Sequence, residues 1–165
     1  MKKVMNLKNL LFCAMLVLTM SLNTVNAQAG TLDYLGSTIN GSVLTNELEA
    51  AGNYQSVARS TYLHQGFVRI TNNGNGYVGV GGGTECNVSC GTVKLNIYLE
   101  RSSGKEDFYS YKKWENVDYN TTSLYMGKEV KVEKGYYYRL RGYHSCTKNG
   151  VTENGGSVTD GIYIG

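Results

Sequence analysis

Charged residues and histidine are scarce in this sequence, and proline is absent. Asp, Glu, Lys and Arg make up 18% of the 165 residues, and glycine alone contributes 21 residues. Long coiled coils and helical arrays are rich in charged residues and poor in glycine, so the composition argues against both. Apolar residues reach 41%, which is too many for a disordered chain. The length fits one domain, and the 21 glycines and 14 tyrosines indicate strands joined by tight turns.

An apolar run long enough to cross a membrane is missing as well. Residues 10–18 are apolar, but this run is shorter than the ~20 residues that a transmembrane helix needs, and no later segment approaches that length. Lysines precede the run, and the small-residue pattern Val25-Asn26-Ala27 follows it. This order is typical of a secretory signal peptide, which we place at residues 1–27. The protein is therefore predicted to be secreted into the extracellular space, without a membrane span.

An excess of charge is also lacking once residues 1–27 are set aside. That segment holds three of the 16 basic residues and none of the 13 acidic residues, so residues 28–165 contain 13 of each. A chain without net charge gives no support for nucleic-acid binding or for attraction to an anionic membrane.

The sequence after the leader predicts strands. Apolar and polar residues alternate from 93 to 99, and the Asn/Gly-rich segment 72–76 predicts a turn, because Asn and Gly tolerate positive φ. The predicted strands are 56–64, 66–71, 77–80, 93–99, 108–114, 124–132 with a break at Gly127, 135–145 and 162–164. We expect a flexible loop to begin at Gly81-Gly82-Gly83 and to include Cys86 and Cys90.

About seven strands and no convincing helix favour an all-β fold, namely an antiparallel β-sandwich of the immunoglobulin-like or fibronectin-like kind. Residues 54–165 would form this domain, and residues 28–53 an extended N-terminal arm or edge strand. Tyr138 has the spacing of a corner tyrosine, whose hydroxyl bonds to upstream backbone, and Tyr136 is the alternative. Trp114 is predicted to fill the core; the alternative is that its ring forms a platform on which a sugar stacks.

Five segments carry a resemblance to a known family. They are residues 41–45, 75–84, 93–101, 135–144 and 160–164. Through them the chain after the leader resembles a family of small secreted Tyr/Gly-rich β-proteins of unknown function from Gram-positive, largely gut-dwelling bacteria. The resemblance implies an exported β-protein, and it implies no catalytic residues.

Three cysteines follow the leader: Cys86, Cys90 and Cys146. Secretion favours a disulfide, and the odd number leaves one thiol over. Pairing of Cys146 with Cys86 or Cys90 would close a loop of roughly 60 residues and stabilise the fold by about 4 kcal/mol, whereas a Cys86–Cys90 bond would close only a small loop. A zinc site formed by Cys86, Cys90, His144 and Cys146 is the alternative.

The predicted strand 135–145 offers a candidate binding face. On it Tyr136, Tyr138, Leu140 and His144 alternate with Tyr137, Arg139, Arg141 and Tyr143, and we assign the first set to the core. If strand 93–99 lies alongside, Lys94, Asn96, Tyr98 and Glu100 join the outer set. Such a ladder is either a stabilised sheet exterior or a flat binding face, since Tyr and Arg anchor interfaces. The binding candidates are Tyr98, Tyr137, Arg139, Arg141 and Tyr143.

Catalytic patterns are lacking. Residues 74–79 spell the glycine fingerprint of dinucleotide sites, but in a strand context rather than at the start of a helix. His64 and His144 are the two histidines, and neither has a recognisable Ser or Asp partner. We therefore predict a non-enzymatic extracellular binding module without a cofactor, whose partner is a glycan, a cell-wall polymer or a protein. The alternatives are a bacteriocin-like antagonistic factor and a small secreted hydrolase.

Overall fold

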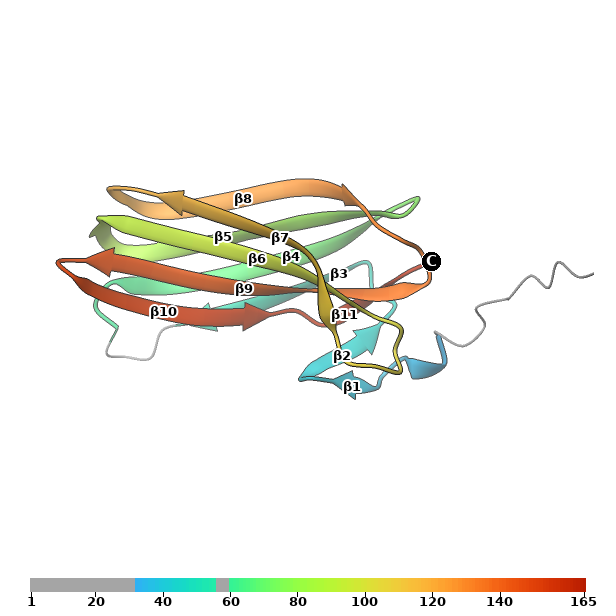
Figure 1. The fold of residues 1–165 in the computed structure, drawn as a ribbon. Helices are drawn as coiled ribbons and strands as arrows, with labels where there is room; N and C mark the ends of the chain where they lie inside the picture. Colours follow the sequence, from blue (N-terminus) through green and yellow to red (C-terminus); the bar gives the residue numbers. More distant parts are fainter. Residues whose placement is uncertain (1–31, 56–59) are drawn as a thin grey trace, which may run out of the picture.

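The computed structural model describes residues 32–55 and 60–165, where two β-sheets pack against each other (Figure 1). The predicted signal peptide, at residues 1–27, lies outside the described residues. A single turn of 3-10 helix, η1 (Leu32–Tyr34), is the one helical element of the described chain. The all-β sandwich predicted from the sequence is confirmed. The strand order does not identify it as immunoglobulin-like or fibronectin-like.

The smaller sheet has four strands in the order β3-β4-β5-β8. They are β3 (Glu49–Gln55), β4 (Leu63–Gly74), β5 (Tyr77–Cys90) and β8 (Thr121–Lys131). The larger sheet has the order β1-β2-β11-β9-β6-β7, and β10 also pairs with β9. Its strands are β1 (Thr38–Ile39), β2 (Ser42–Thr45), β6 (Thr92–Ser102), β7 (Tyr109–Asp118), β9 (Tyr136–Lys148), β10 (Val151–Val158) and β11 (Gly161–Ile164). Neighbouring strands are antiparallel except β2 and β11, which run parallel.

Asn-Gly pairs make three of the hairpin turns. They are Asn40-Gly41 between β1 and β2, Asn75-Gly76 between β4 and β5, and Asn149-Gly150 between β9 and β10, and all six residues have positive φ. These turns match the twist of the strands that they join. The turn predicted at 72–76 is confirmed.

The core between the sheets follows the predicted alternation. Leu95, Ile97 and Leu99 of β6 are fully buried, together with Leu140 of β9. Tyr138 is also fully buried, and its hydroxyl donates a hydrogen bond of 2.8 Å to the carbonyl of Glu133, so the predicted corner tyrosine is confirmed. Trp114 on β7 packs against the edge of the core and stays half-buried.

The predicted flexible loop at Gly81-Gly82-Gly83 is wrong, because β5 runs through it without interruption. The glycines there serve close packing. A Cβ at Gly82 would lie 2.6 Å from the carbonyl oxygen of Phe67 and 2.9 Å from Cδ1 of Ile97 in the facing sheet. The predicted break at Gly127 is also absent, since β8 is continuous and a Cβ there would meet nothing within 4 Å.

Strand boundaries differ from the prediction at two further places. Residues 60–62 precede β4 rather than forming a strand, and the rest of the predicted strand start, 56–59, lies outside the described residues. Strand β10 was not predicted, and the N-terminal segment contributes β1, β2 and β3, so the described chain has eleven strands. Residues 32–55 contain η1, β1, β2 and β3, and β3 is an edge strand of the smaller sheet.

Candidate functional site

On the outer face of the larger sheet, side chains of three neighbouring strands lie opposite one another in rows; each row is called a ladder below. Strands β6 and β9 are neighbours, as the predicted face requires, and β10 extends the sheet beyond β9. Tyr98 of β6 lies opposite Arg141 of β9, which lies opposite Val158 of β10. In the next ladder Tyr143 of β9 lies opposite Gly156 of β10. The sheet register therefore gathers Tyr98, Arg141 and Tyr143 on one surface.

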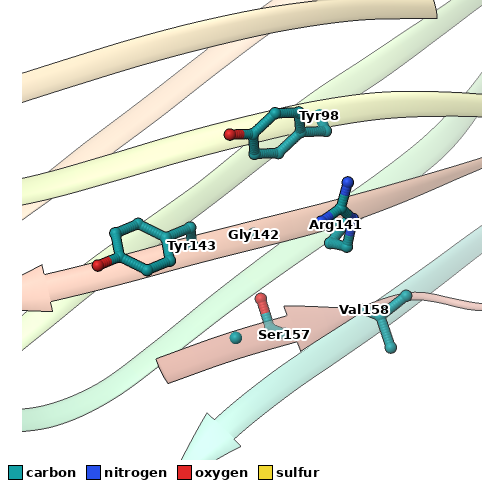
Figure 2. A pocket seen from close by; sticks show the side chains of 7 residues that line it. Tyr98, Arg141, Gly142, Tyr143, Ser157 and Val158 are labelled. Carbon is teal, nitrogen blue, oxygen red and sulfur yellow. The ribbon is translucent and has the colours of Figure 1, made fainter. Parts of the chain in front are cut away.

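A shallow groove of about 310 Å³ follows these ladders (Figure 2). Its lining residues are Tyr98, Arg141, Gly142, Tyr143, Gly156, Ser157 and Val158. Because Gly156 has no side chain, the surface beside Tyr143 is open down to the backbone. The side chain of Arg141 is 53% exposed, and Tyr143 and Val158 are also exposed. The groove thus combines two aromatic rings, an aliphatic wall and an accessible guanidinium.

A buried carboxylate sets the charge of the groove. Glu100 is almost fully buried and accepts hydrogen bonds from Nε of Arg139 at 2.9 Å and from Nε of Arg141 at 2.8 Å. Nη2 of Arg141 also lies 2.7 Å from the same carboxylate. The single negative charge of Glu100 is therefore shared by Arg139 and Arg141. The three groups together carry a net charge of +1, and Arg141 is the exposed member.

The Arg141 side chain is held in place from two directions. Glu100 binds the Arg141 guanidinium on one side. On the other side, Cζ of Arg141 lies 4.8 Å from the centroid of the Tyr98 ring. Both Nε and Nη2 of Arg141 contact one oxygen of Glu100, Oε1. This charge-assisted pair and the cation–π contact together restrict the arginine. On the other side of Tyr98, Lys113 lies 5.2 Å from the ring centroid and is paired with Glu115.

Two of the predicted binding residues do not reach this surface. Tyr137 and Arg139 are buried, so the prediction that they face solvent is wrong. Tyr137 packs with Leu44 and Phe108 in a small apolar cluster on the outer side of the sheet. The side-chain alternation on β9 was predicted correctly, but the end of the face near Tyr137 is covered.

The N-terminal strands provide that cover. Nη1 of Arg139 donates to the carbonyl of Asn40 at 3.1 Å and to Oγ of Ser42 at 2.9 Å, in and beside the β1–β2 hairpin. Phe108 closes the other side, with its ring centroid 4.2 Å from Cζ of Arg139. Residues about 100 positions earlier in the chain thus remove Arg139 from solvent.

Sequence reasoning missed the contribution of β10. Gly156, Ser157 and Val158 line the groove, but no strand was predicted there. The Asn149-Gly150 pair, which turns the chain from β9 into β10, was the available signal.

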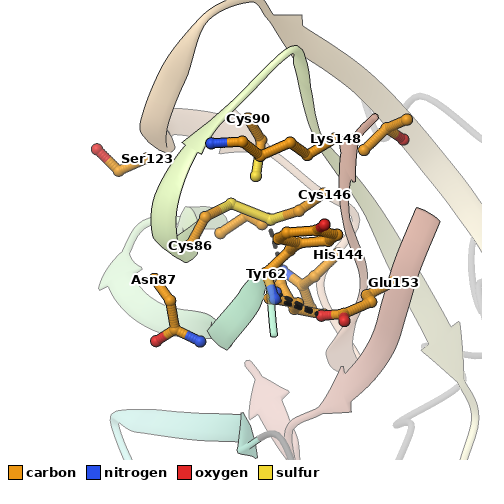
Figure 3. The surroundings of a disulfide bond; sticks show 12 residues. Tyr62, Cys86, Asn87, Cys90, Ser123, His144, Cys146, Lys148 and Glu153 are labelled. Atoms are coloured by element: carbon orange, nitrogen blue, oxygen red, sulfur yellow. Dashed lines mark hydrogen bonds between the residues drawn. A yellow bond between two sulfur atoms is a disulfide. The ribbon is translucent and has the colours of Figure 1, made fainter. Parts of the chain in front are cut away.

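At the far end of β9, Cys146 forms a disulfide with Cys86 of β5, which belongs to the facing sheet (Figure 3). This settles the pairing that the sequence left open. Cys90 keeps a buried thiol and is the one free cysteine of the described residues. The Sγ atoms of all three cysteines lie within 4.8 Å of one another.

His144 does not complete a zinc site with these cysteines, because its ring nitrogens have other partners. Nδ1 lies 2.9 Å from Oγ1 of Thr84, and Nε2 lies 2.8 Å from Oγ of Ser157. Burial lowers the pKa of His144 to about 4, so the ring is neutral at physiological pH. The four-residue zinc set predicted as an alternative is therefore not formed in this structure.

The glycine fingerprint at 74–79 falls in the β4–β5 hairpin and not at the start of a helix, so its predicted strand context is confirmed. Across residues 32–55 and 60–165, none of the helical structure has the length and apolar character that a membrane crossing requires.

Comparison with known families gives a match over most of the chain. The model of DUF6147, a family of unknown function, matches residues 25–161. No curated protein matches the chain. The family match agrees with the resemblance drawn from the sequence in pointing to a family of unknown function. Gram-positive origin stays a prediction.

Proposed function

Because the chain belongs to DUF6147, a family of unknown function, we propose a function from its own residues: a secreted, non-enzymatic protein that binds an extracellular ligand in the groove of β6, β9 and β10. The positive charge left at Arg141 beside two tyrosine rings is the observation on which the proposal rests. Interfaces and ligand sites commonly combine aromatic rings with a few placed polar groups.

The same chemistry indicates an anionic glycan or cell-wall polymer as the ligand. Carboxylate and phosphate groups pair well with a guanidinium, which offers several N–H donors in one plane. Tyrosine rings offer flat apolar surfaces with a polar hydroxyl, which suits a sugar ring with apolar and polar edges. A groove of about 310 Å³ that is open along the sheet accommodates one unit of a longer chain.

The site is already organised before a ligand arrives. Arg141 is fixed by Glu100, and Glu100 is fixed in turn by Arg139 under the N-terminal hairpin. A side chain that is ordered in advance loses less entropy on binding, so more of the contact energy appears as affinity.

The candidate catalytic groups support binding over hydrolysis. Both ring nitrogens of His144 are engaged within the core, and Glu100 is shared by two arginines. Neither group is placed to exchange a proton with a ligand in the groove. The hydrolase stays an alternative, and so does the antagonistic factor, which a growth-inhibition assay with purified protein would separate from the binder.

A binding screen against glycans and isolated cell walls tests the proposal. The variants are Arg141→Ala and Tyr143→Ala, with Arg69→Ala as the matched control. Arg69 lines a second hollow, of about 260 Å³, on the opposite sheet, and its side chain is similarly exposed and paired with Glu49. We expect the groove variants to lose binding about tenfold or more, and the control to bind like the wild type. Wild-type binding by both groove variants would refute the proposal.

A further inference from the structure

The three cysteines of the described chain meet where β5 leaves its partner β8. Pairing between these strands skips from Glu85 to Cys90, so residues 86–89 bulge out of the ladder. Cys86 is the first residue of this bulge, Cys90 follows its last residue, and Cys146 approaches from β9. Figure 3 shows the sulfur of Cys90 turned toward the Cys86–Cys146 bond. A thiol and a disulfide thus lie side by side, with all three Sγ atoms within 4.8 Å of one another.

We propose that Cys90 exchanges with this disulfide and that Cys86, once released, is a covalent modification site for small disulfides. In the first step the Cys90 thiolate attacks Sγ of Cys146. The Cys90–Cys146 bond forms, the Cys86–Cys146 bond breaks, and Cys86 leaves as a thiolate. Cys90 gives up one proton and Cys86 can take one up, so this step needs no oxidant or reductant.

The exposure of the three cysteines determines which exchange product can react with a molecule from solution. Cys86 is 9% exposed, whereas Cys90 is 1% exposed and Cys146 is fully buried. Exchange toward Cys90–Cys146 therefore frees the most exposed of the three cysteines. The other exchange product, Cys86–Cys90, would leave its free thiol on Cys146, out of reach of solvent.

The released Cys86 then reacts with a disulfide from outside. Its thiolate attacks one sulfur of R–S–S–R, giving a mixed disulfide on Cys86 and releasing R–S⁻. The product keeps Cys90–Cys146 as its internal bond, so strand β5 stays tied to β9 while the cysteine partner changes. The chemical class taken up is a low-molecular-weight disulfide.

The surroundings of Cys90 make the first step slow. Its thiol donates to the carbonyl of Val88 at 3.4 Å, and burial raises its pKa, with Glu153 acting in the same direction and Lys148 opposing. The apolar neighbours Leu63 and Val93 keep water away. Because the thiolate is the attacking species, exchange accelerates as the pH rises.

Oxidised glutathione is the probe for the test. The purified protein is incubated with it at neutral and at alkaline pH, quenched with acid, digested without reduction and mapped by mass spectrometry. We expect glutathione on Cys86 together with a Cys90–Cys146 peptide, formed about tenfold faster per pH unit below the pKa of Cys90. Persistence of Cys86–Cys146 at alkaline pH, or glutathione on Cys90 alone, would overturn the proposal.

Cys90→Ser removes the nucleophile and retains the Cys86–Cys146 bond. This variant should show no glutathione on Cys86, and Cys90→Ala, which adds no hydroxyl to the apolar site, should behave alike. Modification of Cys86 at the wild-type rate in a folded Cys90 variant would show that Cys90 takes no part. Neither result depends on the groove.

Discussion

Glu100 and Arg139 are direct partners across β6 and β9, and their side chains form an ion pair of 2.9 Å that is almost wholly buried. The pair connects the β1–β2 hairpin with the groove. On one side Arg139 binds the β1–β2 hairpin through Asn40 and Ser42, and on the other Glu100 holds the exposed Arg141. The carboxylate is therefore both a structural counter-charge and the support of the proposed binding residue.

Replacing Glu100 by glutamine should destabilise the fold strongly. The amide keeps the size of the side chain but leaves Arg139 buried without a counter-charge, which costs about 3 kcal/mol in unfolding free energy. Urea unfolding of Glu100→Gln measures this. The control is Glu115→Gln, because Glu115 forms an exposed pair with Lys113 and should contribute less than about 1 kcal/mol. Equal losses in the two variants would contradict this account.

Filling the groove should weaken binding without harming the fold. A Cβ at Gly156 would meet only the carbonyl oxygen of Gly142, at 3.6 Å, so Gly156→Leu can project its side chain beside Tyr143. We expect affinity for an anionic cell-wall ligand to fall about tenfold or more, with unfolding free energy unchanged within about 0.5 kcal/mol.

Gly127→Leu is the matched control, because it places the same side chain in open space on the opposite sheet. Isothermal titration of both variants compares them. If Gly127→Leu loses as much affinity as Gly156→Leu, the ligand does not depend on the β6, β9 and β10 groove.

Local sequence rules predicted the parts of the site that depend on neighbouring residues. The alternation of 93–99 and the spacing around Tyr138 gave the strands, their inner face and the corner hydrogen bond. Arg141 and Tyr143 were placed on the outer surface for the same reason, since period-2 geometry is local.

Contacts between distant segments could not be predicted in this way. Arg139 follows the same alternation as Arg141, yet Ser42 covers it from almost 100 residues away. Strand β10 escaped prediction because Gly155 and Gly156 hide the alternation. Packing explains the first of them, since a Cβ at Gly155 would lie 2.4 Å from the Tyr54 ring.

His144 should make the fold sensitive to mild acid. Burial lowers its pKa from 6.5 to about 4 in the folded protein. Between these values the unfolded chain takes up a proton that the folded protein does not, so unfolding free energy falls as the pH drops from 6.5. The loss should reach about 3 kcal/mol near pH 4.

Urea unfolding of wild type and His144→Gln across this range tests the prediction. Glutamine can bond to Thr84 and Ser157 but does not titrate, so its curve should lack the drop. A wild-type unfolding free energy that stays flat from pH 6.5 to 4 would show that His144 is not buried as a neutral ring.

Glu153 should control stability in stronger acid. Its carboxylate accepts hydrogen bonds from Oγ of Ser60 at 2.6 Å and from the backbone N–H groups of Thr61, Tyr62 and Leu63 at 2.8 to 2.9 Å (Figure 3). Burial by itself would raise the pKa of Glu153, but these hydrogen bonds outweigh it and lower the pKa to about 2. The folded state therefore favours the charged carboxylate. Its contribution is complete above pH 4.5 and is lost as the pH falls from 4.5 to about 2.

Glu153→Gln should remove most of that acid-dependent loss and should also speed hydrogen exchange at the Tyr62 and Leu63 amides at neutral pH, since a neutral amide oxygen binds them less strongly. Glu129→Gln is the control, because this exposed carboxylate accepts one side-chain hydrogen bond, from Asn73. The acid slope from urea unfolding and the exchange rates of the two amides should change together in Glu153→Gln and not in Glu129→Gln. An unchanged acid slope in Glu153→Gln would mean that the segment before β4 is held by contacts other than this carboxylate.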